Sequence, residues 1–249
     1  MYAGPGTQRT WWLLGYADKA RARTLQTLEW CRQFSDPQSV AFVHVFAGFF
    51  YQYCGEPLEA ERVADICIAL CDEHGIVQER EWIAPVRGWA LAKQGRIDEG
   101  LKILHASLER HRAMHSQLNV PYFFALLAEI LLDANRLDEG LEAIDEALRL
   151  AEQTQMRAFL AEMYRVKGEL LHARDHEDPD VKHLFWHALE IAERQTARAL
   201  QLRAAMSLLR VSTTAAERTE ARAVLERVYA GFTESFTTVD LVNAKAMLA

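Results

Sequence analysis

Apolar residues recur along this chain at the three- and four-residue spacing that is typical of helices buried on one face. The stretch from Pro121 to Thr154 shows this pattern twice, with a break at Asn135. Its two apolar stripes are Tyr122, Leu126, Leu127, Ile130 and Leu131, then Leu137, Leu141, Ile144, Ala147, Leu148 and Ala151. The period-two alternation that marks strands is absent from the sequence. The pattern therefore predicts an all-α protein built of helix pairs.

Small residues repeat in three series at intervals of 40 positions. The series are Gly15, Gly55, Gly95 and Asn135; Gly48, Gly88, Ala128 and Gly168; and Ala20, Ala60, Gly100 and Gly140. Glycine and asparagine accept the left-handed conformation that ends a helix, so the first series predicts turns. Apolar positions keep the same interval until one residue is inserted within 174–180, a polar stretch that we expect to be a loop.

The second series lies in the middle of predicted helices, where glycine costs about 1 kcal/mol relative to alanine. Its recurrence at a costly position predicts close contact between helices, with the third series as the partner. Small residues in both helices of a pair, with an apolar stripe on each, are typical of tetratricopeptide repeats. We therefore expect a right-handed superhelical α-solenoid of tetratricopeptide-like hairpins with a 40-residue period.

The whole chain, 1–249, is expected to form one helical-repeat domain. It would contain a part-unit over 1–36 with its second helix at 17–34, five helix pairs over 37–236, and a capping helix within 237–249, from about Thr238 to Leu248. Four prolines mark expected helix starts: Pro37, Pro57, Pro121 and Pro179. Pro85 lies inside the predicted helix 82–94, which should therefore start late or bend.

Composition narrows the class of protein. The chain is 50% hydrophobic and 25% charged, as in ordinary globular domains, and its net charge of −7 disfavours binding to nucleic acid or to anionic membranes. No apolar run reaches the roughly 18 residues of a membrane span, and the first residues lack the pattern of a signal peptide. The four cysteines are too few for a disulfide scaffold. We expect reduced thiols and a cytoplasmic location.

Motifs for catalysis or cofactors are missing: the sequence has no P-loop, no G-x-S-x-G, no H-E-x-x-H and no EF-hand loop. Histidine and cysteine pairs do occur at one-turn spacing, namely Cys67 and Cys71, His111 and His115, His172 and His176, and His183 and His187. Two ligands on one helix are insufficient for a zinc site, and packed thiols with solvated histidines are the simpler interpretation. We expect no enzyme, no cofactor and no metal.

In a tetratricopeptide superhelix the first helix of each pair lines a concave groove. Counted from the small residue of each unit, the candidate groove residues are Phe42, Phe49, Tyr53, Trp82, Trp89, Lys93, Tyr122, Glu129, Glu162, Arg165, Glu169 and His172. The groove would be aromatic in its N-terminal half and polar further on. Aromatic anchors with charged side chains suit a protein or peptide partner.

Two alternatives stay open at this point. The aromatic residues of the stripe would equally well pack between neighbouring helices. Glu162, Arg165 and Glu169 share one helical face, where they would form an intrahelical ion-pair run if exposed, or a structural support or ligand clamp if buried.

Several short segments resemble a known family in their order and spacing. They are Leu14-Gly15-Tyr16, Arg87-Gly88-Trp89-Ala90-Leu91-Ala92, Leu126-Leu127-Ala128-Glu129, 162–169 (EMYRVKGE), Ala188-Leu189-Glu190-Ile191-Ala192, 202–209 (LRAAMSLL), and Phe232-Thr233-Glu234 with Asp240-Leu241. From about residue 11 onwards the chain resembles the tetratricopeptide-like C-terminal region of bacterial STAND-type signalling ATPases, many of which carry a class III adenylate/guanylate cyclase domain or a DNA-binding domain. None of those other domains occurs in this sequence.

The resemblance implies a regulatory module, the sensor or scaffold arm of a bacterial signalling or transcriptional-regulation system. Its partners would be a protein or peptide in the groove and an ATPase or cyclase domain, in the same chain or a neighbouring one. The chain would be a piece of a longer regulator or a stand-alone arm. A homodimer through the N-terminal end is also expected if Trp11-Trp12-Leu13-Leu14 is exposed. The alternative function is a sensor that binds a small ligand or peptide in the groove.

Overall fold

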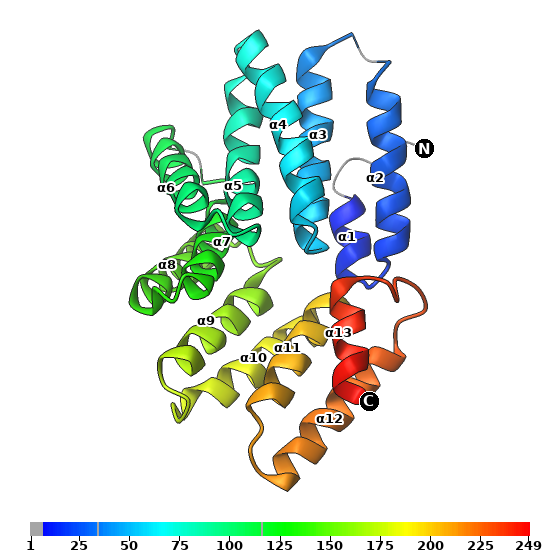
Figure 1. The fold of residues 1–249 in the computed structure, drawn as a ribbon, viewed down its shortest axis with the longest axis vertical. Coiled ribbons are helices and arrows are strands. Elements are labelled where there is room, and N and C mark those ends of the chain that lie inside the picture. The colour runs from blue at the N-terminus through cyan, green and yellow to red at the C-terminus, as the bar shows by residue number, and fades with distance from the viewer. Residues whose placement is uncertain (1–6, 34, 116) are drawn as a thin grey trace.

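The computed structural model describes residues 7–33, 35–115 and 117–249, and within them every regular element is a helix (Figure 1). The helices are α1 (Thr7–Leu13), α2 (Ala17–Cys31), α3 (Pro37–Tyr53), α4 (Pro57–His74), α5 (Val77–Lys93), α6 (Ile97–Ala113), α7 (Val120–Asp133), α8 (Leu137–Thr154), α9 (Leu160–Arg174), α10 (Asp180–Arg194), α11 (Arg198–Val211), α12 (Ala215–Ala230) and α13 (Val239–Leu248). The expectation of an all-α protein is confirmed for this part of the chain.

Each helix packs against the next one along the chain, an arrangement consistent with an α-solenoid. The odd-numbered helices α3, α5, α7, α9 and α11 also contact one another in turn and so form an inner layer, while the even-numbered helices from α4 to α12 flank it (Figure 1). Phe50, Ile83, Phe123 and Leu170 are fully buried along this inner layer. The inner layer therefore holds much of the core, and it places helices that are far apart in the sequence next to one another.

The turns inside the pairs adopt the conformation that the sequence predicts. Gly15, Gly55, Gly95 and Asn135 have φ values of 93°, 71°, 88° and 55°. A second group of left-handed residues ends the second helices, and it consists of Gly75, His115, Gln155 and Thr196. Because only one member of that group is glycine, its recurrence is not evident from glycine spacing.

The predicted close contact between small residues is confirmed at one pair of helices. A Cβ on Gly88 would lie 2.8 Å from the carbonyl oxygen of Gly100, so α5 and α6 touch backbone to backbone. At two other positions the predicted partner is wrong, because Gly48 makes room for Ile83 and Gly140 for Leu170, both of the next pair. Gly168 does meet the second helix of its own pair, where it makes room for the Phe185 ring of α10. Large side chains take the space there, so the small residues serve different contacts.

Prolines mark helix starts as expected, with one correction. Pro37 and Pro57 open α3 and α4, Pro121 is the second residue of α7, and Pro179 precedes α10. The expected late start around Pro85 is wrong, because α5 begins at Val77 and contains the proline. The helix predicted over 17–34 ends at Cys31, and Phe34 lies outside the described residues, as do residues 1–6 of the predicted part-unit.

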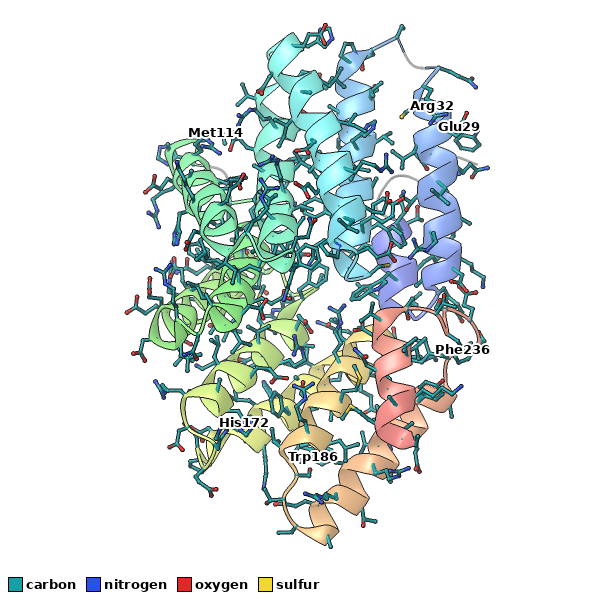
Figure 2. All side chains as sticks on the ribbon, viewed as in Figure 1. Glu29, Arg32, Met114, His172, Trp186 and Phe236 are labelled. Atoms are coloured by element: carbon teal, nitrogen blue, oxygen red, sulfur yellow. The ribbon has the colours of Figure 1, made fainter. Side chains whose placement is uncertain are left out.

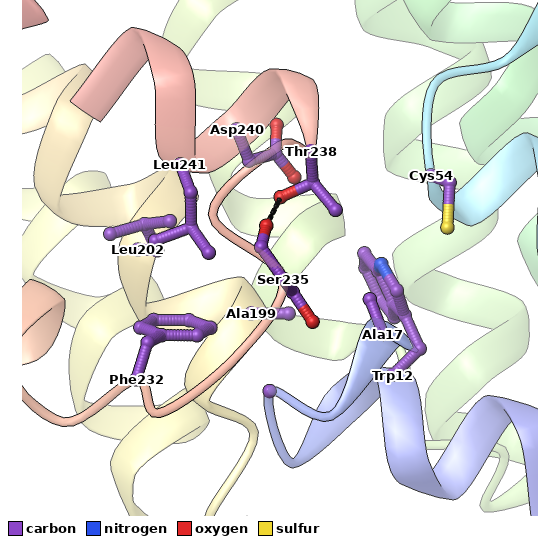
Figure 3. Close-up of a pocket in the computed structure, with 11 residues that line it drawn as sticks. Trp12, Ala17, Cys54, Ala199, Leu202, Phe232, Ser235, Thr238, Asp240 and Leu241 are labelled. Carbon is purple, nitrogen blue, oxygen red and sulfur yellow. Dashed lines mark hydrogen bonds between the residues drawn. The ribbon is translucent and has the colours of Figure 1, made fainter. Parts of the chain in front are cut away.

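The two ends of the chain meet and close the array. The backbone N–H of Asp18 donates to Ser235 Oγ at 3.0 Å, and the N–H of Ser235 donates to Asp18 Oδ2 at 2.8 Å. Gly15 approaches Phe232 so closely that a Cβ would lie 2.9 Å from its ring. Figure 3 shows this junction, where a cavity of only about 20 Å³ remains.

The expected homodimer assumes that the segment Trp11-Trp12-Leu13-Leu14 is exposed, but Trp12 is buried. Trp12 is 4% exposed, stacks on Tyr53 with ring centroids 5.3 Å apart, and lies under the guanidinium of Arg203. Trp11, Leu13 and Leu14 are half-buried. The chain's own C-terminal helices therefore cover part of the apolar surface on which the expected homodimer rests.

Within the described residues, no helix combines the length and the apolar character that crossing a bilayer requires.

Candidate functional site

A cavity of about 410 Å³ opens at the centre of the inner layer, and we call it the central cavity. All five inner helices from α3 to α11 contribute to it, together with α13 and the turn before α4. Its lining residues are Gln52, Gly55, Pro57, Trp89, Lys93, Glu129, Glu162, Arg165, Arg203, Met206, Ser207, Arg210, Asp240 and Asn243. Five of the twelve residues predicted for the groove, Trp89, Lys93, Glu129, Glu162 and Arg165, are among them.

One wall of the central cavity is held by Lys93 of α5. Its ammonium lies 2.6 Å from Glu129 and 2.6 Å from Asp133, both on α7. Burial alone would lower the pKa of Lys93, but these two carboxylates raise it above its ordinary value. Trp89 donates from Nε1 to Glu129 at 3.3 Å, with its ring buried. On this wall the positive charge of Lys93 is therefore paired with the carboxylates of Glu129 and Asp133.

The opposite wall is built on the Glu162–Arg165–Glu169 face of α9. Arg165 lies 2.8 Å from Glu162 and 3.2 Å from Glu169, so the three side chains pair along the helix, in the buried setting for which the sequence left a structural support or a ligand clamp as alternatives. These side chains are only 11 to 16% exposed, which makes the run a largely buried one. Glu169 also accepts from Ser207 at 2.6 Å and from Arg210 at 3.0 Å, which ties α9 to α11.

Arg203 of α11 joins this wall to both ends of the chain. Its guanidinium lies 2.8 Å from Asp240, 3.4 Å from Glu162, and donates to the backbone oxygen of Tyr53 at 2.7 Å. Burial works against the charge of Glu162, but Arg165 and Arg203 overcome it and lower the pKa of Glu162 to about 2. Glu162 thus stays ionised at neutral pH, and the contacts of Arg203 position α9, α11 and α13 around the cavity.

The predicted groove aromatics Phe49, Tyr53 and Tyr122 are packed, as the packing alternative describes. They are 5%, 6% and 8% exposed and stack in one cluster with Phe159 and Trp12. The hydroxyl of Tyr122 donates to Gln52 Oε1, and Gln52 lines the central cavity. The rings of Phe49, Tyr53 and Tyr122 therefore pack in the core, and none of them lines the central cavity.

Three other predicted residues lie away from the central cavity. Phe42 and Trp82 are half-buried in the first half of α3 and of α5, where their ring centroids are 6.5 Å apart. His172 lies near the outer end of α9 beside His176, with ring centroids 4.6 Å apart (Figure 2). Glu169 does not line the cavity itself but holds Arg165, which does.

The sequence reasoning missed the contributions of α11 and α13: Arg203, Arg210, Met206, Ser207, Asp240 and Asn243. A signal for two of them existed. Arg203 and Arg210 follow Glu162 and Glu169 by 41 positions, which is the repeat interval plus the inserted residue, and each arginine contacts that glutamate. Asp240 and Asn243 belong to the cap, for which the interval makes no prediction.

Four basic and three acidic side chains line the central cavity, each within ion-pair distance of an opposite charge. Among the residues that the structure describes, no group of three or more His, Cys, Asp or Glu side chains is placed to hold a metal ion. The arrangement is a polar recess with fixed charges of both signs, suited to recognising a segment that carries charges itself.

No family model matches the chain. It is similar to the uncharacterized protein R02095 of Rhizobium meliloti (strain 1021), with 31% identity over 122 residues. The match covers 49% of this chain and 12% of the relative, so the chain spans only a small part of the relative's length.

Proposed function

We propose that this chain is a non-enzymatic, tetratricopeptide-like interaction module whose central cavity receives a charged segment of a partner protein. The observation that carries this proposal is the convergence of five successive inner helices on one recess with fixed charges of both signs. Recognition by such a recess depends on charge pairing, which favours specificity over raw affinity.

We also propose the handedness and the repeat length of the module. The module is a right-handed superhelix with a 40-residue period, and it acts as the sensor or scaffold arm of a bacterial signalling or transcriptional-regulation system. The resemblance to STAND-type signalling ATPases supports this role, and so does the match to a short part of a much longer bacterial protein. An ATPase or cyclase domain is the proposed neighbour. The four buried free cysteines support a reducing, cytoplasmic setting.

Affinity capture from the source cell tests the module with three versions of the protein. Asn243 is exposed and lines the central cavity, so Asn243→Trp should fill the recess without disturbing the core. Lys245→Trp is the matched control, since Lys245 is exposed on the same helix but does not line the cavity. Wild type and the control should retain the same partner, and Asn243→Trp should lose it. Identical capture by all three would reject the proposal.

A second candidate function is a sensor for a small ligand or peptide in the same recess. The volume of about 410 Å³ favours it, because small-molecule sites commonly occupy about 300–1,000 Å³. A ligand that binds only the folded state raises the melting temperature. A screen of metabolites and peptides should therefore yield a compound that stabilises the wild type and the Lys245→Trp variant but not Asn243→Trp. A screen without any stabilising compound would contradict this candidate.

A further inference from the structure

A second cavity, of about 560 Å³, lies where three turns between helix pairs meet α1, and we call it the turn-side cavity. Its lining residues are Arg9, Leu13, Asn119, Pro121, Tyr122, Gln155, Met156, Arg157, Ala158, Phe159, Met163, Gln195 and Ala197. Most of them are apolar or uncharged. The size falls within the range of about 300–1,000 Å³ that is usual for small-molecule sites.

The charges of the turn-side cavity are unbalanced. Arg9 and Arg157 line it, and no acidic residue does. Neither arginine has a carboxylate within ion-pair distance among the described residues, whereas each basic side chain of the central cavity has one. Two exposed arginines with no carboxylate partner in the described part of the chain therefore lie beside an apolar wall, which gives this region a local positive charge in a protein whose net charge is −7.

The helices that begin at this cavity add to its positive potential. Asn119, Phe159 and Ala197 line the cavity and directly precede α7, α9 and α11, and no side chain caps any of these three helix starts. The N-terminus of a helix carries a partial positive charge. The backbone therefore reinforces the two guanidinium groups.

Gln195 supplies one unsatisfied polar group in the wall. Its Nε2 donates to the backbone oxygen of Arg157 at 2.8 Å, which holds the turn that carries this arginine. Its Oε1 is buried and has no hydrogen-bond partner in the described part of the chain. Because this oxygen has no accessible surface, the part that Gln195 plays at the cavity is to hold the turn that carries Arg157.

We propose that the turn-side cavity binds an organic anion with an apolar body, an acyl carboxylate being the simplest example. The apolar part would lie against Leu13, Met156 and Met163, and the carboxylate would face Arg9 and Arg157. This site is separate from the central cavity. The two cavities share no lining residue among those described, and the Tyr122 side chain, which lines the turn-side cavity, donates to Gln52 in the other.

Calorimetric titration of the whole chain with decanoate tests the proposal, with decanol and decyltrimethylammonium as neutral and cationic probes of equal chain length. Decanoate should bind at least about tenfold more tightly than decanol, a factor equal to one well-placed charge interaction. The cationic probe should bind more weakly still. Added salt should weaken decanoate binding and leave decanol binding unchanged.

Variants locate the site. Arg9→Gln and Arg157→Gln should each reduce decanoate affinity several-fold and erase its advantage over decanol. Arg32→Gln, at a 75% exposed arginine that directly follows α2 and does not line the cavity, should bind as the wild type does. Ala158→Trp should block all three probes, because Ala158 is an exposed lining residue and tolerates a larger side chain.

Three results would overturn the proposal: no decanoate binding to the folded wild type, equal affinity for decanoate and decanol, or undiminished affinity in the Arg9 and Arg157 variants. The outcome is independent of the partner-binding role. Ala158→Trp fills the turn-side cavity only, and Asn243→Trp fills the central cavity only.

Discussion

Glu162 keeps its charge because of two arginines that come from different helices. Its side chain is 14% exposed, and Arg165 and Arg203 lower its pKa from an ordinary 4.5 to about 2. A depressed carboxyl pKa stabilises the fold above the ordinary value, and this contribution is lost as the pH falls towards the folded value. The relevant window is therefore from about pH 4.5 down to pH 2.

Glu162→Gln should remove this pH dependence. At pH 7 the variant should be less stable by about 3 kcal/mol, since two largely buried guanidinium groups lose a charged partner. Between pH 4.5 and 2 its melting temperature should fall less steeply than that of the wild type. Melting curves across this range measure both effects. Glu226→Gln, at an exposed ion pair of α12, serves as the control and should match the wild type. Parallel curves for wild type and Glu162→Gln would refute the assignment.

Gly100 marks the point where α5 and α6 touch. A Cβ there would lie 2.4 Å from the carbonyl oxygen of Gly88 and 2.8 Å from the Cβ of Ala92. Alanine in place of glycine normally stabilises a helix by about 1 kcal/mol. We expect the opposite for Gly100→Ala, a loss of about 2 kcal/mol from overpacking, measured by urea unfolding.

Gly95→Asn gives the matched control for Gly100→Ala. Gly95 has a φ of 88° with open space around it, and Asn135 adopts a φ of 55° in the equivalent turn. Asparagine tolerates this conformation, so the control should change stability only slightly. If Gly100→Ala is as stable as the wild type, the backbone contact does not restrict this position.

At the scale of elements, α5 contains a proline whose missing hydrogen bond is replaced by a side chain of α6. Pro85 has no N–H, so the carbonyl of Glu81, four residues earlier, lacks its helical donor. The hydroxyl of Ser107, on α6, donates to that oxygen at 3.4 Å. This contact explains how α5 runs through a residue that usually ends or bends a helix.

A double-mutant cycle tests this compensation. Ser107→Ala alone should cost about 1 kcal/mol, because it leaves a buried carbonyl unsatisfied. In the Pro85→Ala background the restored N–H binds Glu81 instead, so the same substitution should cost much less. Urea unfolding of the four proteins gives the coupling energy. Strictly additive effects would mean that Ser107 does not compensate for the proline.

Much at this scale could be predicted from the sequence. Helical spacing gave α7 and α8 almost to the residue, and the glycine series gave the left-handed turns at Gly55 and Gly95. The turns at His115 and Gln155 were missed because neither residue is a glycine or belongs to one of the three 40-residue series. The late helix start predicted at Pro85 is wrong, and the hydroxyl that compensates for the proline comes from Ser107, 22 positions further along.

At the scale of the whole molecule, Trp12 couples the two ends. An open solenoid transmits stability only between neighbouring units, so damage at the first unit stays there. Here the ring of Trp12 contacts Tyr53 and Arg203. We expect Trp12→Ala to cost about 3 kcal/mol and to increase hydrogen exchange in α2 and in α11 to α13 together, with α5 to α8 less affected.

Trp30→Ala provides the comparison, since Trp30 of α2 is 40% exposed. It should leave exchange in the C-terminal helices unchanged. Loss of protection confined to α1 and α2 in Trp12→Ala would show that the ends are energetically independent.

The candidate site was only partly predictable for the same reason. Lys93, Glu129 and Glu162 follow from the repeat interval because they lie on successive inner helices. Arg203 reaches Tyr53, 150 positions away, and Asp240 belongs to the cap. Such contacts depend on the curvature of the helical array. Neither the spacing of apolar residues nor the repeat length predicts that curvature.

The contact between Asp18 and Ser235 also bears on how this fold can change in evolution or by design. An open stack tolerates the gain or loss of a helix pair, since every unit needs only its neighbours. In a closed array an added pair would push the two ends out of register and uncover Trp12 and Phe232. Duplication of a unit, a common route by which repeat proteins lengthen, would therefore have to redesign this junction at the same time.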